Sequence, residues 1–391
     1  MSMRGGRGLW AACCRCLSMH AQSDVNQRIP AAISGAHRHS EVTSRELPIV
    51  CVTGASGYLA TEIVAQLLES GKYRVHGTVR SLGNERLGRR HPLRLLPGAE
   101  QRLKLFEAQL LFPGSYDECM DKAQYLIHTA SPFVTTNITN AQEQLISPAV
   151  NGTRNVLRSA VAAGVKRAVV TSSVGAIMGS FKEKKGVFDE DDWNKSSSLS
   201  STNGLDLYRL SKKLGEQAAW DLCDSKGLEM AAVNPSFIIG PPRMSRRAGE
   251  SLSYMRSFLE GSVPARGDSP VADIRDVARA HILAAELPSA AGLRFLISTP
   301  GAVRNAEVSR LLAEQYPDLG IQDLGEPEPV RRELFRSKNL ERVLGMQLQP
   351  HRRSVLDMAD RMLQMLRAGV RFGCGPRQFR WRDERCPPQV R

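Results

Sequence analysis

The sequence predicts an α/β fold in which a doubly wound parallel sheet carries a smaller C-terminal lobe. Three observations predict it. Short apolar runs alternate with stretches of helix length from Leu47 onward, a glycine-rich turn follows the first apolar run, and the alternation becomes irregular after Pro235. Strands separated by crossover helices form parallel sheets that are covered on both faces. The length of 391 residues is enough for one large domain with an accessory lobe.

The first strand and helix are the most clearly marked elements. The apolar run Pro48 to Val52 predicts a strand, and apolar residues on one face predict a helix from Tyr58 to Ser70, which ends at Gly71. Five further strands are expected at 74–79, 103–106, 125–128, 168–171 and 230–234, which makes six in the sheet. Helices expected near 250–259, 275–286, 306–315 and 354–367 would build the smaller lobe.

The chain divides into four parts. Residues 1–46 are rich in Arg and poor in acids, which is typical of a mitochondrial transit peptide or of a disordered leader. Residues 47–235 are expected to form the sheet domain, and residues 236–368 a lobe interleaved with it. Residues 369–391 are a basic tail, expected to be disordered. The expected location is the cytoplasm, or the mitochondrion if the leader is a transit peptide.

Charge and cysteine content exclude several classes of protein. The net charge of +13 is partly concentrated at the two ends, and no basic motif is interleaved with aromatic residues, so no nucleic-acid partner is expected. No apolar run reaches about 18 residues, so no membrane span is expected. The eight cysteines form no paired metal-binding motif, which predicts no metal site. We expect a monomer or a homodimer.

A glycine turn follows the first strand, with the spacing Gly54-x-x-Gly57-x-x-Ala60. Gly54 permits a tight turn, Gly57 allows the backbone to approach a pyrophosphate, and the following helix offers free N–H groups to the anion. A plain strand-to-helix turn is the alternative. The position between a strand and a helix favours dinucleotide binding. The expected cofactor-binding residues in this segment are Thr53, Gly54, Ser56, Gly57, Tyr58 and Leu59.

The end of the second strand indicates which dinucleotide is bound. An acidic residue there would hold the ribose of NAD(H), whereas Arg accommodates the 2′-phosphate of NADP(H). Arg80 occupies this place, so NADP(H) is expected and NAD(H) is the less favoured alternative. Arg80 could also be an ordinary solvated charge, and Glu85 lies downstream.

Three side chains could carry acid–base chemistry. Tyr208 and Lys212 are four residues apart and therefore share one face of a helix. The ammonium of Lys212 would favour the phenolate of Tyr208 and also bond to the cofactor ribose. Ser173 follows an apolar strand at the edge where such sheets bind ligands, so it can orient a substrate oxygen.

These motifs resemble the extended short-chain dehydrogenase/reductase family, which belongs to the NAD-dependent epimerase/dehydratase superfamily. The resemblance is to the branch of dihydroflavonol reductase and cinnamoyl-CoA reductase. It runs from about Ile49 to Leu366 and includes His128-Thr129-Ala130-Ser131-Pro132, Asn234-Pro235-Ser236 and Asp273-Ile274-Arg275-Asp276-Val277. It implies that Ser173, Tyr208 and Lys212 are catalytic. It also implies that Arg80, Gln109, Leu110, Thr129, Ala130, Ser131, Pro235 and Ile238 contact the cofactor.

The sequence departs from the branch at three places. Gln109 replaces an Asp near the adenine, Met178 replaces a substrate-binding Asn, and Leu205-Asp206-Leu207 replace the cinnamoyl-CoA reductase signature before Tyr208. The expected function is NADPH-dependent reduction of a small aldehyde, ketone or flavanonol-like carbonyl compound. The alternatives are a sugar-nucleotide epimerase or dehydratase, a hydroxysteroid dehydrogenase, or a non-catalytic regulator that senses NADP.

Overall fold

The computed structural model describes residues 46–83, 91–131, 136–180, 183, 186–244, 249–326 and 333–370. The expected leader, apart from Glu46, and the expected tail, apart from Gly369 and Val370, lie outside the described residues. Within these ranges, no helix is both long enough and apolar enough to cross a membrane.

The centre of the fold is a sheet of seven strands in the order β3-β2-β1-β4-β5-β6-β9, all of them parallel. The doubly wound fold is therefore confirmed. All six expected strands are present, but the predicted number of six is wrong, because a seventh strand pairs with β6. The strands are β1 (Ile49–Thr53), β2 (Arg74–Val79), β3 (Leu103–Glu107), β4 (Ala123–His128), β5 (Arg167–Thr171), β6 (Glu229–Pro235) and β9 (Arg294–Ile297).

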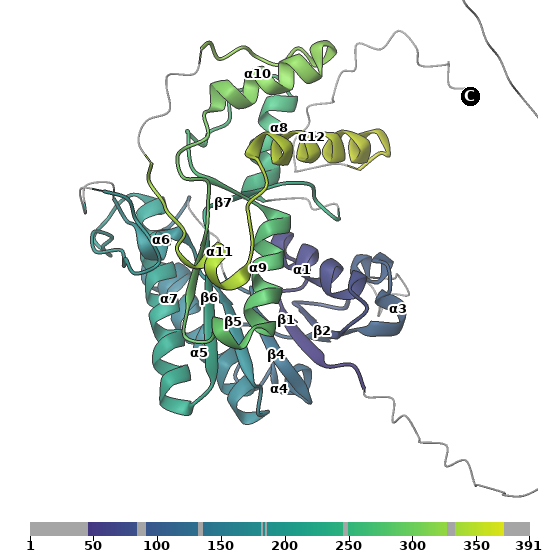
Figure 1. Ribbon diagram of the computed structural model, residues 1–391, viewed down its shortest axis with the longest axis vertical. Coiled ribbons are helices and arrows are strands. Elements are labelled where there is room, and N and C mark those ends of the chain that lie inside the picture. Colours follow the sequence, from purple (N-terminus) through teal and green to yellow (C-terminus); the bar gives the residue numbers. More distant parts are fainter. Residues whose placement is uncertain are drawn as a thin grey trace, which may run out of the picture. The chain divides into compact units, whose positions relative to one another are not determined.

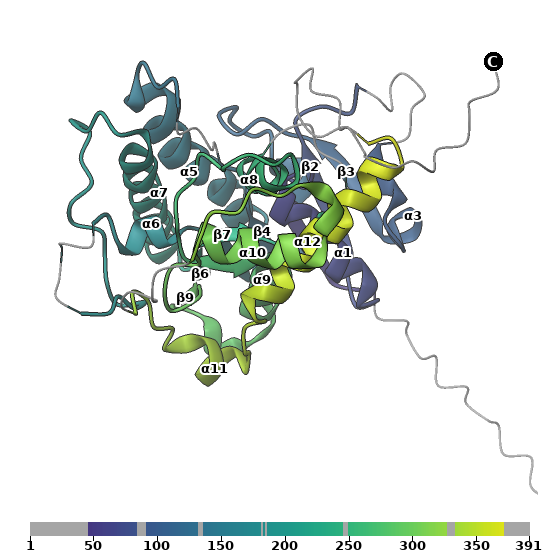
Figure 2. The same cartoon turned by 90° about the horizontal axis from the view of Figure 1, so that it is seen from above.

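Helices cover both faces of this sheet (Figures 1 and 2). The α-helices among the described residues are α1 (Tyr58–Glu69), α3 (Ala99–Arg102), α4 (Asp117–Met120), α5 (Ser147–Ala162), α6 (Val174–Ile177), α7 (Gly204–Lys226), α8 (Glu250–Leu259), α9 (Ile274–Glu286), α10 (Asn305–Gln315), α11 (Asn339–Leu344) and α12 (His351–Arg367). Short 3-10 turns span Pro92–Leu95, Pro288–Ala290 and Pro317–Leu319, and a π turn at Gln142–Ile146 precedes α5.

Alternation along β1 shows how the two layers form. Val50 and Val52 pack into one core with α1, α9 and α11, whereas Ile49 and Cys51 pack into another with α4, α5 and α7. Successive side chains of a strand point to opposite faces, and a parallel sheet with helices on both sides buries both sets. The continuous apolar run of β1 is the consequence.

The C-terminal lobe has its own apolar core. Strands β7 (Phe237–Ile239) and β8 (Val271–Asp273) pair in parallel, and their side chains pack with α8, α10 and α12. In Figure 1 these elements lie beyond one end of the strands. The helix expected near 275–286 was assigned to this lobe, but as α9 it packs beside α1 against the sheet. Strand β9, which was not expected, also lies in the range assigned to the lobe and joins the sheet.

Candidate active site

The glycine turn after β1 is held in one conformation by hydrogen bonds. The Gly57 amide donates to the carbonyl of Gly54 over 2.7 Å, and the Gly54 amide donates to the Thr78 hydroxyl over 3.0 Å. Gly54 has a φ of +64°, and a Cβ there would come within 3.3 Å of Ala130. The turn leads directly into α1, whose first N–H groups remain available to an anion. A pyrophosphate group therefore fits this turn.

Thr53 links the turn to the end of β4, where the strand order reverses. Its hydroxyl accepts hydrogen bonds from the amides of Thr129 (3.1 Å) and Ala130 (3.2 Å) and bonds to Nδ1 of His128 over 2.8 Å. Ligands of doubly wound sheets bind at this reversal. The structure thus brings Thr53, Thr129 and Ala130 to the same edge as the glycine turn, and Ser131 follows there, exposed to solvent.

The residues expected near the adenosine part of the cofactor lie at the ends of β2 and β3. Arg80 directly follows β2, and Gln109 lies two residues after β3; both are exposed. The two strands end side by side, because Val79 of β2 lies opposite Glu107 of β3. Leu110 packs against Gly152, where a Cβ would meet its side chain at 2.4 Å. The Glu107 carboxylate accepts the amide of Leu82, so an acid shares this edge with Arg80.

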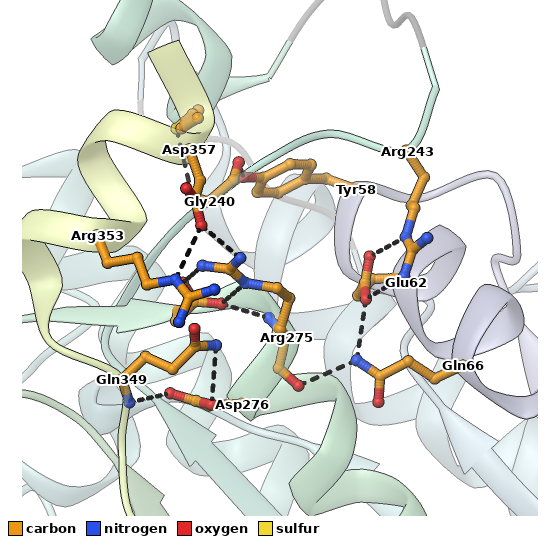
Figure 3. A network of polar contacts seen from close by, with 12 residues as sticks. Tyr58, Glu62, Gln66, Gly240, Arg243, Arg275, Asp276, Gln349, Arg353 and Asp357 are labelled. Carbon is orange, nitrogen blue, oxygen red and sulfur yellow. Dashed lines mark hydrogen bonds and ion pairs between the residues drawn. The ribbon is translucent and has the colours of Figure 1, made fainter. Parts of the chain in front are cut away.

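The remaining expected cofactor residues lie nearer to the C-terminal lobe. Tyr58 donates its hydroxyl hydrogen to the carbonyl of Gly240 over 2.5 Å, as Figure 3 shows, so its side chain joins α1 to that lobe. Pro235 ends β6, and Ile238 lies within β7. Ser56 lies in the glycine turn, half-buried, and Leu59 is buried in the first turn of α1.

The three catalytic candidates come together where β5 ends and α7 begins. Ser173 caps the short helix α6, its hydroxyl accepting the Gly175 amide over 3.1 Å, and that hydroxyl also bonds to the Tyr208 phenol. The Lys212 ammonium lies 5.7 Å from the centre of the Tyr208 ring. The expected proximity of Ser173, Tyr208 and Lys212 is thus present.

Burial determines the protonation of this set. Burial raises the pKa of the Tyr208 phenol, while the bond to Ser173 and the charge of Arg266 lower it. Burial also lowers the pKa of Lys212 to about 8, an effect that the nearby Glu216 carboxylate opposes. At neutral pH the phenol therefore carries its proton and the lysine is largely charged. The cation Arg266 was not foreseen, because 58 residues separate it from Tyr208 in the sequence.

A buried carboxylate lies behind the catalytic set. Glu216, two turns after Tyr208 on the same face of α7, accepts hydrogen bonds from the Ser172 hydroxyl (2.5 Å), the Asn234 amide (2.9 Å) and Arg294 Nε (2.6 Å). The Asn234 amide also donates to the Ser173 carbonyl over 3.2 Å. Sequence reasoning missed this network, although the spacing of Glu216 from Lys212 was a signal for it.

A small cavity of about 20 Å³ adjoins Lys212 and is lined in part by His128, Thr153 and Ser172. It has room for about one water molecule. Burial, with a contribution from the charge of Lys212, lowers the pKa of His128 to about 3, so this imidazole is neutral. Among the residues that the structure describes, no group of three or more His, Cys, Asp or Glu side chains could hold a metal ion.

The chain is similar in sequence to known reductases. The chain is 35% identical to cinnamoyl-CoA reductase 2 of Arabidopsis thaliana over 314 residues, which cover 79% of this chain and 90% of that one. It is 37% identical to tetraketide alpha-pyrone reductase 1 of the same plant over 278 residues, covering 70% of this chain and 82% of that one.

The fold is also similar to those of solved reductase structures. Yeast methylglyoxal/isovaleraldehyde reductase Gre2, complexed with NADPH, matches with a TM-score of 0.71 and 26% identity over 81% of this chain and 99% of that one. Vestitone reductase from alfalfa (Medicago sativa) matches with a TM-score of 0.66 and 29% identity over 82% and 99%.

The family resemblance noted in the sequence is confirmed by these relatives and by a match of residues 50–297 to the family itself. The chain belongs to the NAD dependent epimerase/dehydratase family, in the branch of the cinnamoyl-CoA reductases.

Proposed function

We propose that this chain reduces the carbonyl group of a small organic molecule, with Tyr208 as the proton donor. The chain is an NAD(P)-dependent oxidoreductase, and its cofactor is NADP(H). The observation that carries the proposed chemistry is the convergence of Ser173, Tyr208 and Lys212 at the carboxyl edge of the sheet.

The glycine turn and the start of α1 would hold the cofactor pyrophosphate. The φ of +64° at Gly54 and its close approach to Ala130 support this assignment, because a Cβ there would be strained and would crowd Ala130 at 3.3 Å, so the tight turn needs glycine. Arg80, exposed at the end of β2, would bind the 2′-phosphate through charge-assisted hydrogen bonds. The bound cofactor supplies a hydride to the carbonyl carbon.

The protein side chains would orient and protonate the carbonyl oxygen of the substrate. Ser173 donates a hydrogen bond that orients the carbonyl, and Tyr208 transfers its proton to the oxygen as negative charge develops there. The hydrogen bond between the Ser173 and Tyr208 hydroxyls supports the proposal that both contact the same substrate oxygen. Lys212, charged and near the Tyr208 ring, favours the phenolate that remains after the transfer.

Replacement of Tyr208 by Phe tests this proposal. The ring and its packing are kept while the proton donor is lost, so turnover should fall by about 10²- to 10⁴-fold. Affinity for NADPH should remain within a few-fold of the wild-type value. The measurements are consumption of NADPH with a panel of aldehydes and ketones, and a titration of NADPH binding.

Tyr316→Phe is the matched control, since the Tyr316 hydroxyl bonds to Asp360 on α12, outside the catalytic set. Its turnover should equal that of the wild type. If Tyr208→Phe reduced the best carbonyl substrate at a near wild-type rate, Tyr208 would not be the donor.

A further inference from the structure

The guanidinium of Arg266, which lies near the active site, stacks on an aromatic ring. Arg266 lies in the loop between α8 and β8, and its guanidinium carbon is 4.0 Å from the centre of the Phe237 ring. Phe237 meets Tyr254 edge to face, with ring centres 5.3 Å apart. Stacking on an aromatic face holds a guanidinium plane in a fixed orientation.

Hydrogen bonds fix the same loop to α10. Arg266 Nε donates to the Ser269 hydroxyl over 3.2 Å, and the Arg266 carbonyl accepts the Asn305 side-chain amide over 2.8 Å. Asn305 in turn accepts the hydroxyl hydrogen of Tyr254 over 3.0 Å. The backbone and the Nε group of Arg266 are thus fixed, and among the described residues no hydrogen bond uses the terminal NH₂ groups of its guanidinium.

Among the described residues, no carboxylate forms an ion pair with Arg266, whereas Arg304, on the neighbouring segment, pairs with Asp268 over 3.1 Å. Burial lowers the pKa of Arg266, and the more distant charge of Glu250 opposes that shift. A guanidinium that is partly removed from water and has no carboxylate partner gains much from binding an anion.

Arg266 also acts on the proposed proton donor. Its charge lowers the pKa of the Tyr208 phenol, and the phenolate charge raises the pKa of Arg266, so the two side chains interact through space. Arg209, the next residue after Tyr208, donates a 3.0 Å bond to the Gly179 carbonyl, and its charge lowers the pKa of Arg266. Arg266 is thus a cation of the C-terminal lobe whose charge reaches the proposed proton donor.

We propose that Arg266 binds an anionic group of the substrate, a carboxylate or a phosphate monoester, on the side of the molecule that faces the C-terminal lobe. The proposal rests on the proposed carbonyl reduction and adds a substrate class to it, the carbonyl compounds that carry such a group. The planar fork of arginine matches two oxygens of a carboxylate or phosphate at once, whereas the ammonium of lysine offers one point of charge.

The test compares substrates that differ only in the anion. One pair is 4-oxobutanoate and its methyl ester, and the other is glycolaldehyde phosphate and glycolaldehyde, each reduced with NADPH. Wild-type kcat/KM should be higher for the charged member of at least one pair, and that pair identifies the anion as carboxylate or phosphate. Arg266→Met should lower kcat/KM for that charged member about 10- to 100-fold, mainly through KM, as expected for a lost charged hydrogen bond.

The neutral members distinguish anion binding from an effect on Tyr208. Loss of the Arg266 charge raises the pKa of Tyr208 for every substrate, so Arg266→Met should lower kcat for the neutral members as well. If Arg266 also binds the anion, kcat/KM falls at least about 10-fold further for the charged member, through KM, and Arg266→Lys restores part of the charged substrate's rate. Equal losses for charged and neutral substrates, through kcat, would overturn the proposal, and so would a wild type that prefers neither charged member. Arg310→Met is the matched control, because Arg310 pairs with Glu326 in the same lobe.

A binding measurement separates this inference from the proposed function. If the wild type reduced none of the four carbonyl compounds or the wider panel, the proposed function would fail. Succinate and inorganic phosphate would then be titrated calorimetrically into the full-length chain. Binding of either one that Arg266→Met weakens at least about 10-fold would support the anion site, and no binding or equal binding by both proteins would overturn it.

Discussion

Helices α7 and α1 are each joined to other elements by carboxylates and guanidinium groups, but in different surroundings. In the pair of Glu216 on α7 with Arg294, the two side chains are 0% and 8% exposed. The cluster on α1 reaches solvent on one side, since Arg243 is 35% exposed and Glu69 is 41% exposed, although its other carboxylate, Glu62, is only 1% exposed. Figure 3 shows this second cluster around Glu62 and Arg243.

The two clusters also serve different parts of the molecule. Glu216 holds the side chains of Ser172 and Asn234 directly behind the catalytic set. The cluster on α1 joins that helix to the C-terminal lobe through Arg243, and nearby Arg275 bridges Asp273 and Asp357 over 2.7 and 2.6 Å. The comparison teaches that burial, more than the number of bonds, sets the cost of breaking an ion pair, because water can replace a lost partner only where it has access.

The largest effect is expected from Arg294→Met. It leaves the Glu216 carboxylate buried without its guanidinium partner, which should lower the free energy of unfolding by about 3–5 kcal/mol. Denaturation in urea measures this. The double replacement Glu216→Gln with Arg294→Met should recover part of the loss, because a neutral amide is less costly to bury. A loss below about 1 kcal/mol in the single variant would show that this region is not sealed from water.

The second largest effect is expected from acid, which should lower the free energy of unfolding by protonating the buried His281. His281 bonds to the Thr171 hydroxyl over 2.7 Å, and burial lowers the pKa of His281 to about 4, below its ordinary value of 6.5. The unfolded chain therefore binds the extra proton between pH 6.5 and 4, so this contribution is present above pH 6.5 and is lost as the pH falls toward 4. The full loss for one such histidine is about 3 kcal/mol.

Replacement of His281 tests this assignment. In His281→Asn, the free energy of unfolding should fall less steeply between pH 6.5 and 4 than in the wild type, even if the variant is less stable at neutral pH. Urea denaturation at a series of pH values measures the slope. An unchanged slope would assign the acid sensitivity to other groups, such as His128.

A smaller effect is expected in the cluster on α1. Arg243→Met removes the guanidinium that bonds to Glu62 (2.6 Å) and Glu69 (2.8 Å), but Glu62 keeps a 2.9 Å bond from the Gln66 amide. Glu62 is itself buried, but water can enter the space left by the partly exposed Arg243, so the loss should be about 1–2 kcal/mol, between the values for buried and surface pairs. Thermal and urea denaturation measure it. A loss as large as that of Arg294→Met would contradict the comparison.

The smallest effect is expected at the surface. Arg336 pairs with Glu333 over 2.8 Å, and their side chains are 64% and 38% exposed. Arg336→Ala should leave the free energy of unfolding unchanged within the error of urea denaturation, at low and at high salt. A loss as large as that of Arg243→Met would mean that exposure does not rank these pairs.

Local pattern was sufficient for much of the fold. The strand expected at 74–79 and the helix expected at 250–259 have the bounds of β2 and α8, and each of the other expected strands differs from the observed one by one or two residues. Strand β9 was missed because it has only four residues, and its role is visible only in its pairing with β6. Short strands carry too little periodicity to be distinguished from loops.

The sequence by itself determined those parts of the site whose residues are close along the chain. The glycine turn depends on neighbouring residues, and Tyr208 and Lys212 share a face because four residues make about one helical turn. Only the tertiary structure decided which distant groups complete them. Arg294 reaches Glu216 across 78 residues, and Tyr58 reaches Gly240 across 182. Such pairs depend on how the layers pack, and no local periodicity encodes that packing.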